Sequence, residues 1–225
     1  MSGISGTPWS YHHRDSVGGS LPVDERLSCW DDVLGTMPEA TLAVRSAAFR
    51  QLLSGRAPAL EEVAAEAGLA YETAREAIDL VASVGMAEID EGTITGMDGL
   101  TTRRTRHQLV VGGVGMWTWC AYDIVGIAAA LVADAVGSTQ CGGCGRGIDV
   151  VIWKGRLDGG TGVVGWLPDA SCSNVMVEFC PSALLFCSRS HLDRWRAREG
   201  NGSGAALDVE SLAERGRSDW RQLVL

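Results

Sequence analysis

The sequence predicts an α+β fold in which a winged-helix-like domain of three helices precedes a domain built on a mixed sheet. Apolar residues recur at helical spacing from Pro38 to about Met97, whereas short β-branched runs and helical segments alternate further on without a strict βαβ rhythm. With 225 residues and 46% apolar content, the chain is long enough to bury a core. We expect a flexible tail over 1–25, the helical domain over 26–99 and the mixed-sheet domain over 100–225.

Three amphipathic patterns follow one another in the helical domain. They predict helices over 39–54, 58–69 and 71–84, the first ending at Gly55. A hairpin is expected next, with strands over 85–89 and 93–95 joined by the turn Asp90-Glu91-Gly92. Three helices and a hairpin are the outline of a winged helix-turn-helix.

The charge of this domain argues against DNA binding. Between Glu39 and Asp98 there are four Arg, no Lys and eleven Asp plus Glu, and the formal charge of the whole chain is −9. The third helix, which would enter the major groove, carries Glu72, Glu76 and Asp79 among its charges, so phosphates would repel it. We therefore expect no nucleic-acid partner and favour a structural or oligomerising role, with a thiol-sensing DNA regulator as the alternative.

The mixed-sheet domain is predicted from short apolar runs and turn residues. Strands are expected over 107–111, 148–153, 163–167 and 183–186, and helices from about Trp119-Cys120 and over 190–199. Asp158-Gly159-Gly160 is a strong turn signal that would join the second and third of these strands. A Gly/Ser-rich loop is expected over 200–204.

No membrane or secretory segment is evident. The longest apolar run, Ile124 to Ala133, is much shorter than the roughly 20 residues that span a bilayer, and residues 1–25 lack the apolar centre of a signal peptide. Seven cysteines, an odd number, do not suggest a disulfide-stapled scaffold. We therefore expect a cytoplasmic protein with reduced thiols and no membrane partner.

Two short motifs carry reactive thiols. Trp117-Thr118-Trp119-Cys120-Ala121-Tyr122-Asp123 places Cys120 and Asp123 three residues apart at a helix start, so that both face one side. The helix dipole should lower the pKa of Cys120 and enrich its thiolate. In Phe179-Cys180-Pro181, Pro181 stops any preceding helical turn, and Cys180 would lie on a chain reversal. The alternative is that both cysteines are small apolar core residues.

Taken jointly, the two motifs resemble the organomercurial (alkylmercury) lyase, or MerB-like, family. Members carry a pattern like Tyr-Ala-Trp-Cys-Ala-x-Asp, and a second element has Phe-Cys, an aromatic-rich strand, a Ser and a downstream Trp. The resemblance covers about residues 100–200, and the acidic helical domain resembles the N-terminal domain of the family. The matching residues are Trp119, Cys120, Ala121, Asp123, Phe179, Cys180, Phe186, Ser188 and Trp195.

The resemblance implies an enzyme that cleaves a carbon–mercury bond by protonolysis without an organic cofactor. Cys120 and Cys180 would be the thiolates that capture mercury, and Asp123 the acid that protonates the departing carbon. The products would be a hydrocarbon and Hg(II) held between the two sulfurs. Low-molecular-weight thiols would be partners, and a mercuric reductase is a candidate acceptor. The alternatives are a homologue with a different substrate and a protein that binds Cu, Zn or Hg without turnover.

The segment Cys141-Gly142-Gly143-Cys144 departs from the family, which typically has one cysteine there. Cys141 would take the place of the family's third, structural cysteine, and Cys144 is an addition. A CxxC pair is half of a tetrahedral zinc site, for which Cys172 and Cys187 are candidate partners, or a redox pair. The pair is thus a candidate second site for zinc or another soft metal. His107 and His191 are expected to be an ordinary strand-edge residue and a helix-surface residue.

Overall fold

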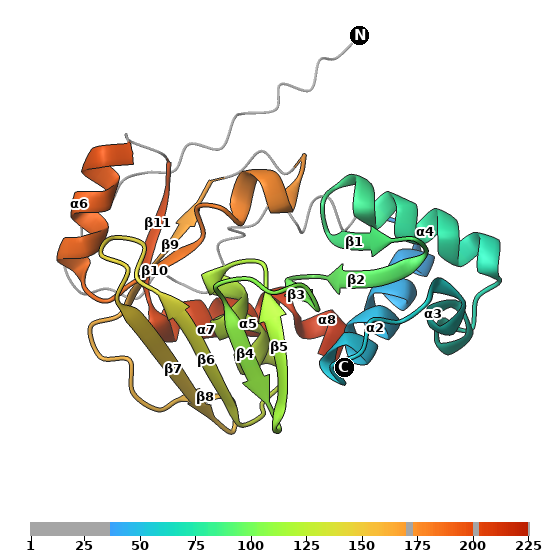
Figure 1. The fold of residues 1–225 in the computed structure, drawn as a ribbon, viewed down its shortest axis with the longest axis horizontal. Coiled ribbons are helices and arrows are strands. Elements are labelled where there is room, and N and C mark those ends of the chain that lie inside the picture. Colours follow the sequence, from blue (N-terminus) through green and yellow to red (C-terminus); the bar gives the residue numbers. More distant parts are fainter. Residues whose placement is uncertain (1–36, 170–172, 200–202, 225) are drawn as a thin grey trace, which may run out of the picture.

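The computed structural model describes residues 37–169, 173–199 and 203–224, so the predicted tail over 1–25 and Cys172 lie outside the described residues. A large and a small antiparallel sheet are accompanied by helices on their faces and ends (Figure 1). The sequence-based expectation of an α+β fold is confirmed.

The helical domain contains the three predicted helices and the predicted hairpin. Gly68, with φ +69°, ends α3 in the left-handed conformation that glycine adopts without strain. At its other end, the carboxylate of Glu62 accepts a hydrogen bond of 2.9 Å from the Ala59 N–H. The elements are α2 (Glu39–Leu53), α3 (Leu60–Ala67), α4 (Tyr71–Ser83), β1 (Ala87–Asp90) and β2 (Thr93–Met97).

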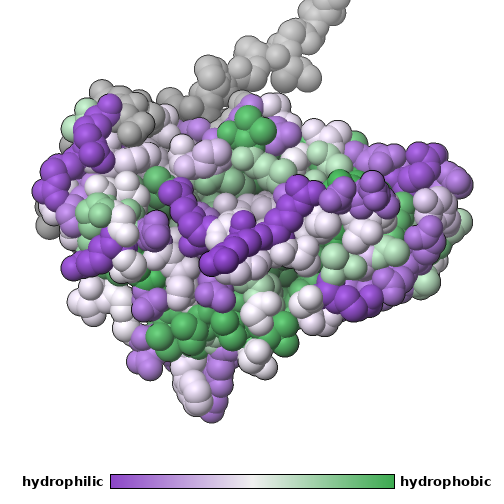
Figure 2. All heavy atoms as spheres, viewed as in Figure 1, coloured by the Kyte–Doolittle hydropathy of each residue, from purple (hydrophilic) through white to green (hydrophobic). Residues whose placement is uncertain are grey.

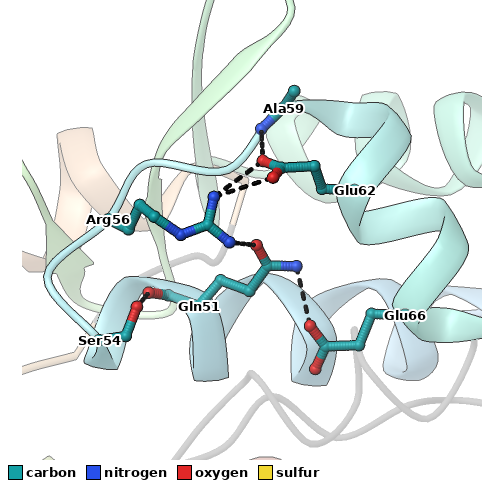
Figure 3. A network of polar contacts seen from close by, with 6 residues as sticks. All are labelled: Gln51, Ser54, Arg56, Ala59, Glu62 and Glu66. Carbon is teal, nitrogen blue, oxygen red and sulfur yellow. Dashed lines mark hydrogen bonds and ion pairs between the residues drawn. The ribbon is translucent and has the colours of Figure 1, made fainter.

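A polar network connects α2 to α3 (Figure 3). The Arg56 guanidinium donates to Glu62 at 2.9 Å and to the Gln51 side-chain oxygen at 2.7 Å. The Gln51 amide in turn donates to Glu66 at 2.8 Å. Since Arg56 and Glu62 are about half exposed, their ion pair contributes little free energy, and the network serves mainly to orient the loop between the helices.

The outer face of α4 is acidic, as predicted. Arg75 is already paired there with Glu72 at 2.9 Å and with Asp79 at 3.3 Å. This surface favours the expectation that no nucleic acid binds, which stays a prediction, as does the winged-helix description of the domain.

The larger sheet has the strand order β1-β2-β3-β5-β4-β6-β7-β8. Its remaining strands are β3 (Leu100–Thr101), β4 (Gln108–Val111), β5 (Val114–Thr118), β6 (Ala135–Gln140), β7 (Gly147–Trp153) and β8 (Arg156–Leu157). The proposed boundary between 26–99 and 100–225 thus falls between β2 and β3, which pair through Gly96–Thr101 and Met97–Leu100. The division into domains stays a prediction, but one sheet runs through both parts.

The smaller sheet has the order β10-β9-β11, and its strands are β9 (Val164–Pro168), β10 (Leu184–Phe186) and β11 (Gly204–Asp208). Asp158-Gly159-Gly160 lies in the connection from β8 to β9, but the strands over 148–153 and 163–167 that it was predicted to join do not pair with each other. β7 instead pairs with β8, across a turn in which Gly155 has φ +72°, and β9 belongs to the other sheet. A turn signal marks a change of direction but does not specify which strand becomes the partner.

Helix α5 (Ala121–Ala130) is buried along its whole length. It lies between the larger sheet and α7 (Val209–Asp219), so its apolar character on every side reflects a core helix. The two helices approach closely: a Cβ added to Gly216 would lie 2.1 Å from the Gly126 Cα. Within the described ranges, no helix is long and apolar enough to cross a membrane.

The remaining helices are α6 (Arg189–Glu199), which follows β10, and α8 (Arg221–Val224), which returns to pack against α2. β5, β6, β11 and α7 were not predicted, and Gly204, expected in a loop, begins β11. Figure 2 shows apolar surface over the region where β6 and β7 lie in Figure 1. Val136, Val151 and Trp153 are the exposed apolar residues of these two strands.

Candidate active site

The junction between β5 and α5 places Cys120 and Asp123 together. Cys120 has extended backbone angles at the N-cap of α5, and Asp123 lies in the first turn. The Asp123 carboxylate accepts a hydrogen bond of 2.8 Å from the Cys120 N–H, and the Cys120 sulfur accepts one from the Asp123 N–H. This reciprocal arrangement is a capping box in which a thiol replaces the usual hydroxyl, so the same bonds that begin the helix also orient its two reactive groups.

Cys180 lies immediately after η1 (Val175–Phe179), a single turn of π-helix. The Asn174 side chain caps this turn by accepting from the Val177 N–H at 3.1 Å, and Pro181 follows it. The predicted short turn ending at Pro181 is therefore confirmed.

A backbone hydrogen bond joins the segments that carry Cys120 and Cys180. The Ala121 N–H, next to Cys120, donates to the Ala183 carbonyl at 3.2 Å. The Tyr122 ring also meets the Phe179 ring edge-on, with 6.2 Å between centroids. The segment that carries Cys180 is thus held against the start of α5.

The three predicted site residues meet. The Cys120 and Cys180 sulfurs and an Asp123 carboxylate oxygen all lie within 4.8 Å of one another. The exposed fractions of the residues are 0%, 7% and 4%, so water reaches them little. Two thiols and one carboxyl group that converge in the protein interior could hold a soft metal ion with an acid beside it.

Burial dominates the ionisation of this site. It raises the pKa of the Cys120 thiol well above its ordinary value, and the neighbouring Cys180 and Asp123 add to the effect. The expectation that the helix dipole would lower the pKa of Cys120 is therefore wrong, because the cost of burying a thiolate exceeds the stabilisation by the dipole.

The pKa of Asp123 is raised from its ordinary value of 3.8 to about 7. The main cause is burial, and the negative charge of Asp98 contributes, whereas N–H donors from Cys120 and Trp119 oppose the rise. A carboxyl group with this pKa is able both to accept and to release a proton near neutral pH.

Two residues of the helical domain that support the position of Asp123 were not predicted from the sequence. Arg45 of α2 forms a buried ion pair of 2.8 Å with Asp98, and Gly99 lies directly against the Asp123 carboxyl group. A Cβ at position 99 would lie 2.7 Å from the Asp123 Cγ. The sequence offered one signal, the pair Asp98-Gly99 directly after β2. Arg45, the partner of Asp98, resembles any other arginine on an amphipathic helix.

A second cluster forms away from these three residues. Ligand atoms of Cys141, Cys144, Cys187 and His191 lie within 4.8 Å of one another. Burial opposes ionisation of Cys141, but N–H donors from Cys187, Gly143 and Cys144 outweigh it and lower the pKa of this thiol to about 7. The prediction that Cys187 lies near the CxxC pair is confirmed, while its other candidate partner, Cys172, is outside the described residues.

The expectation for His191 is wrong, whereas His107 lies at the edge of β4 as expected, although it is buried. His191 is half-buried, and its Nδ1 lies 2.8 Å from the Cys187 sulfur. His107 is buried directly before β4, and its Nδ1 lies 2.8 Å from the Thr139 hydroxyl. Burial is the main cause that lowers the pKa of His107 to about 4, and the positive charge of Arg106 adds to it. The spacing Cys187-x-x-x-His191 is common in metal-ligand pairs and could have indicated that His191 lies beside the Cys187 thiol.

Known proteins share this arrangement of sequence and fold. The model of the alkylmercury lyase family matches residues 100–219. An alkylmercury lyase of Pseudomonas putida is 30% identical over 165 residues, which cover 72% of this chain and 76% of that protein. One of Staphylococcus epidermidis is 28% identical over 173 residues, covering 75% and 77%. The crystal structure of the mercury-bound form of MerB2 superposes with a TM-score of 0.80 at 20% identity, over 87% of this chain and 97% of that chain.

The match covers more than half of the chain, and it includes the segments that carry both reactive thiols. The chain therefore belongs to the alkylmercury lyase family.

Proposed function

We propose that this protein cleaves the carbon–mercury bond of organomercurials by protonolysis, with Cys120 and Cys180 as the mercury ligands and Asp123 as the proton donor. The convergence of ligand atoms from three buried residues within 4.8 Å of one another carries the proposal. The names of the relatives support a lyase, and the chemistry of these side chains supports this particular reaction.

Capture begins with exchange of thiol ligands on mercury. An organomercurial in a thiol-rich solution is bound to a low-molecular-weight thiolate, and sulfur outcompetes nitrogen and oxygen for this soft metal. The Cys180 sulfur bonds to mercury while the bond to the small thiolate breaks, and the small thiolate leaves with the proton that Cys180 gives up. The second cysteine then bonds to the same mercury atom, which still holds its carbon.

The proton for the reaction comes from the thiols themselves. Because the pKa of Cys120 is raised, this residue enters the reaction as a thiol and must lose its proton when it bonds to mercury. Asp123 lies within 4.8 Å and, with a pKa of about 7, is able to accept that proton. Binding of mercury therefore leaves Asp123 protonated, as the next step requires.

Cleavage then transfers the proton from Asp123 to the carbon. The electron pair of the carbon–mercury bond becomes that of the new carbon–hydrogen bond, the hydrocarbon leaves, and the Asp123 carboxylate remains. Two sulfur ligands increase the electron density on the carbon and favour its protonation. Mercury is Hg(II) before and after, so no reductant is consumed. Low-molecular-weight thiols, or a mercuric reductase as candidate acceptor, would then remove it from Cys120 and Cys180.

Reduced thiols are a requirement of this chemistry, and the five described cysteines are free. A cytoplasmic location, where thiols are kept reduced, therefore belongs to the proposal.

The test is the conversion of phenylmercury in excess thiol. The reduced protein should release benzene, detected in the headspace by gas chromatography, and in deuterated water each benzene should carry one deuterium. Asp123→Asn keeps the acceptor oxygen for the Cys120 N–H but has no proton to give, so it should retain mercury and release no benzene. Benzene production by Asp123→Asn at the wild-type rate would refute the assigned proton donor.

The same assay separates the alternative functions. Tight retention of mercury by the wild-type chain with neither benzene nor, from methylmercury, methane would indicate a soft-metal binding protein, for which burial of both thiols is also suitable. Neither retention nor product would indicate a homologue with a different substrate.

A further inference from the structure

We propose that Cys141, Cys144, Cys187 and His191 bind a structural Zn(II) ion that joins the two sheets. This site is separate from the mercury site, and the proposal does not depend on the proposed lyase activity. Three sulfurs and one imidazole nitrogen within 4.8 Å make a complete Cys₃His set, a composition typical of closed structural zinc sites.

The separations of the ligand atoms suit a tetrahedral ion. Zinc–sulfur bonds of 2.3 Å place two sulfurs about 3.8 Å apart around a tetrahedral centre. The Cys144 and Cys187 sulfurs are 3.7 Å apart, and the Cys141 sulfur lies 3.9 Å from the His191 Nδ1. The Cys187 sulfur and the His191 Nδ1 are closer, at 2.8 Å, and have to separate by about 0.8 Å to share a zinc ion. Both residues are only partly buried.

A disulfide explains these separations poorly. The distance of 3.7 Å between the Cys144 and Cys187 sulfurs is far above the bonded length of about 2.05 Å, and a disulfide would leave Cys141 and His191 without a role.

The backbone around the cluster is shaped for metal binding. Gly143 and Cys187 direct their N–H groups at the Cys141 sulfur at 3.4 Å, an arrangement that stabilises a metal-bound thiolate. A Cβ at Gly143 would lie 2.9 Å from the His191 carbonyl oxygen, so a glycine is needed for the CxxC loop to lie against α6. The spacing, Cys-x₂-Cys followed by Cys-x₃-His, matches that of structural zinc modules.

The cluster lies where the two sheets meet. Cys141 follows β6 of the larger sheet and Cys187 follows β10 of the smaller one, while His191 belongs to α6. The Gly142 N–H donates to the Leu185 carbonyl at 2.9 Å across the same junction. A zinc ion here would hold β10 in place, and β10 follows the segment that carries Cys180.

Zinc suits this ligand set better than the other soft metals. A mixed set of three thiolates and one imidazole in tetrahedral array satisfies zinc, which is borderline-soft and has no geometric preference of its own. The deeply buried pair Cys120 and Cys180, without an imidazole, is left for the softer mercury.

The first experiment measures zinc in the full chain purified under reducing conditions, by mass spectrometry of the metal. We expect one zinc per chain in the wild type and in Cys120→Ser, and a loss of at least tenfold in zinc occupancy in Cys144→Ser and His191→Gln. Cys144 is exposed, so its serine variant loses no core packing. Cobalt(II) loading provides a second measurement: the wild type and Cys120→Ser should show thiolate-to-cobalt charge transfer and tetrahedral d–d bands, which Cys144→Ser should lose.

The second experiment measures stability. A chelator should lower the melting temperature of the zinc-loaded wild type by about 10 °C and leave that of Cys144→Ser unchanged. Three outcomes would overturn the proposal: a reduced wild-type chain that takes up no zinc, zinc that is lost with Cys120→Ser but kept by Cys144→Ser, and a Cys144–Cys187 disulfide in protein isolated without oxidant.

Discussion

Gly99 and Asp123 are in direct contact, although they come from opposite sides of the proposed domain boundary. Gly99 lies in the turn between β2 and β3 with φ +94°, and the Asp123 carboxyl group occupies the space that any side chain at position 99 would fill. The turn after β2 therefore determines where the Asp123 carboxyl group lies.

Gly99→Ala should impair catalysis more than mercury capture. Its Cβ would lie 2.7 Å from the Asp123 Cγ, so the carboxyl group has to move, while the sulfurs of Cys120 and Cys180 keep their elements. We expect benzene release from phenylmercury to fall at least tenfold, about 1.4 kcal/mol, with mercury retention unchanged. Gly92→Ala is the matched control, since Gly92 also has positive φ but no atom near the added Cβ. Equal losses in the two variants would mean that backbone strain alone is responsible.

Arg45→Met should destabilise the fold strongly. The ion pair of Arg45 with Asp98 is buried, with side-chain exposures of 5% and 3%, so removing one partner leaves an uncompensated charge. We expect a loss of about 3–5 kcal/mol in the free energy of unfolding, measured by urea denaturation. Arg50→Met on the same helix breaks an ion pair with Glu66 that is half exposed, and it should cost less than about 1 kcal/mol. Similar costs at both positions would contradict the importance of burial.

Asp123 should make the protein less stable as the pH rises from about 4 to about 7. Its pKa is raised from 3.8 to about 7 in the folded state, so the folded chain binds more protons than the unfolded chain in this range. The stabilisation that protonated Asp123 gives the folded state is fully present below pH 4. It is lost as the pH rises through 7. Asp123→Asn cannot ionise, and its free energy of unfolding relative to wild type should increase by up to about 4 kcal/mol across this range. Parallel pH profiles for the two proteins would show that the carboxyl group titrates normally.

Gly216→Ala should disrupt the contact between α5 and α7. The added Cβ would lie 2.1 Å from the Gly126 Cα, and neither backbone is able to yield without displacing a core helix. We expect a loss of at least about 3 kcal/mol in the free energy of unfolding. Gly147→Ala, at an exposed strand position with open space, should change it by less than about 0.5 kcal/mol. A small effect at Gly216 would imply that the helices separate easily.

Much of the local structure was predictable because it depends on neighbours in the sequence. The start of α5, the spacing of Cys120 and Asp123, and the end of the turn at Pro181 each follow from rules that act over a few residues. The helices of the first domain follow from their periodicity and from terminators such as Gly68. Strand partners were less predictable, because nothing in the residues of β7 and β9 indicates which sheet each strand joins.

The residue pattern alone identifies two thiols in recognisable motifs and a carboxyl group on the same helical turn as the first. Only the tertiary structure decided that Cys180 meets Cys120, that Arg45 and Gly99 support Asp123, and that His191 joins the CxxC pair. It also reversed the expected shift in the pKa of Cys120. The physical reason is that dipoles and spacing act locally along a helix, whereas burial and convergence arise when distant segments pack together.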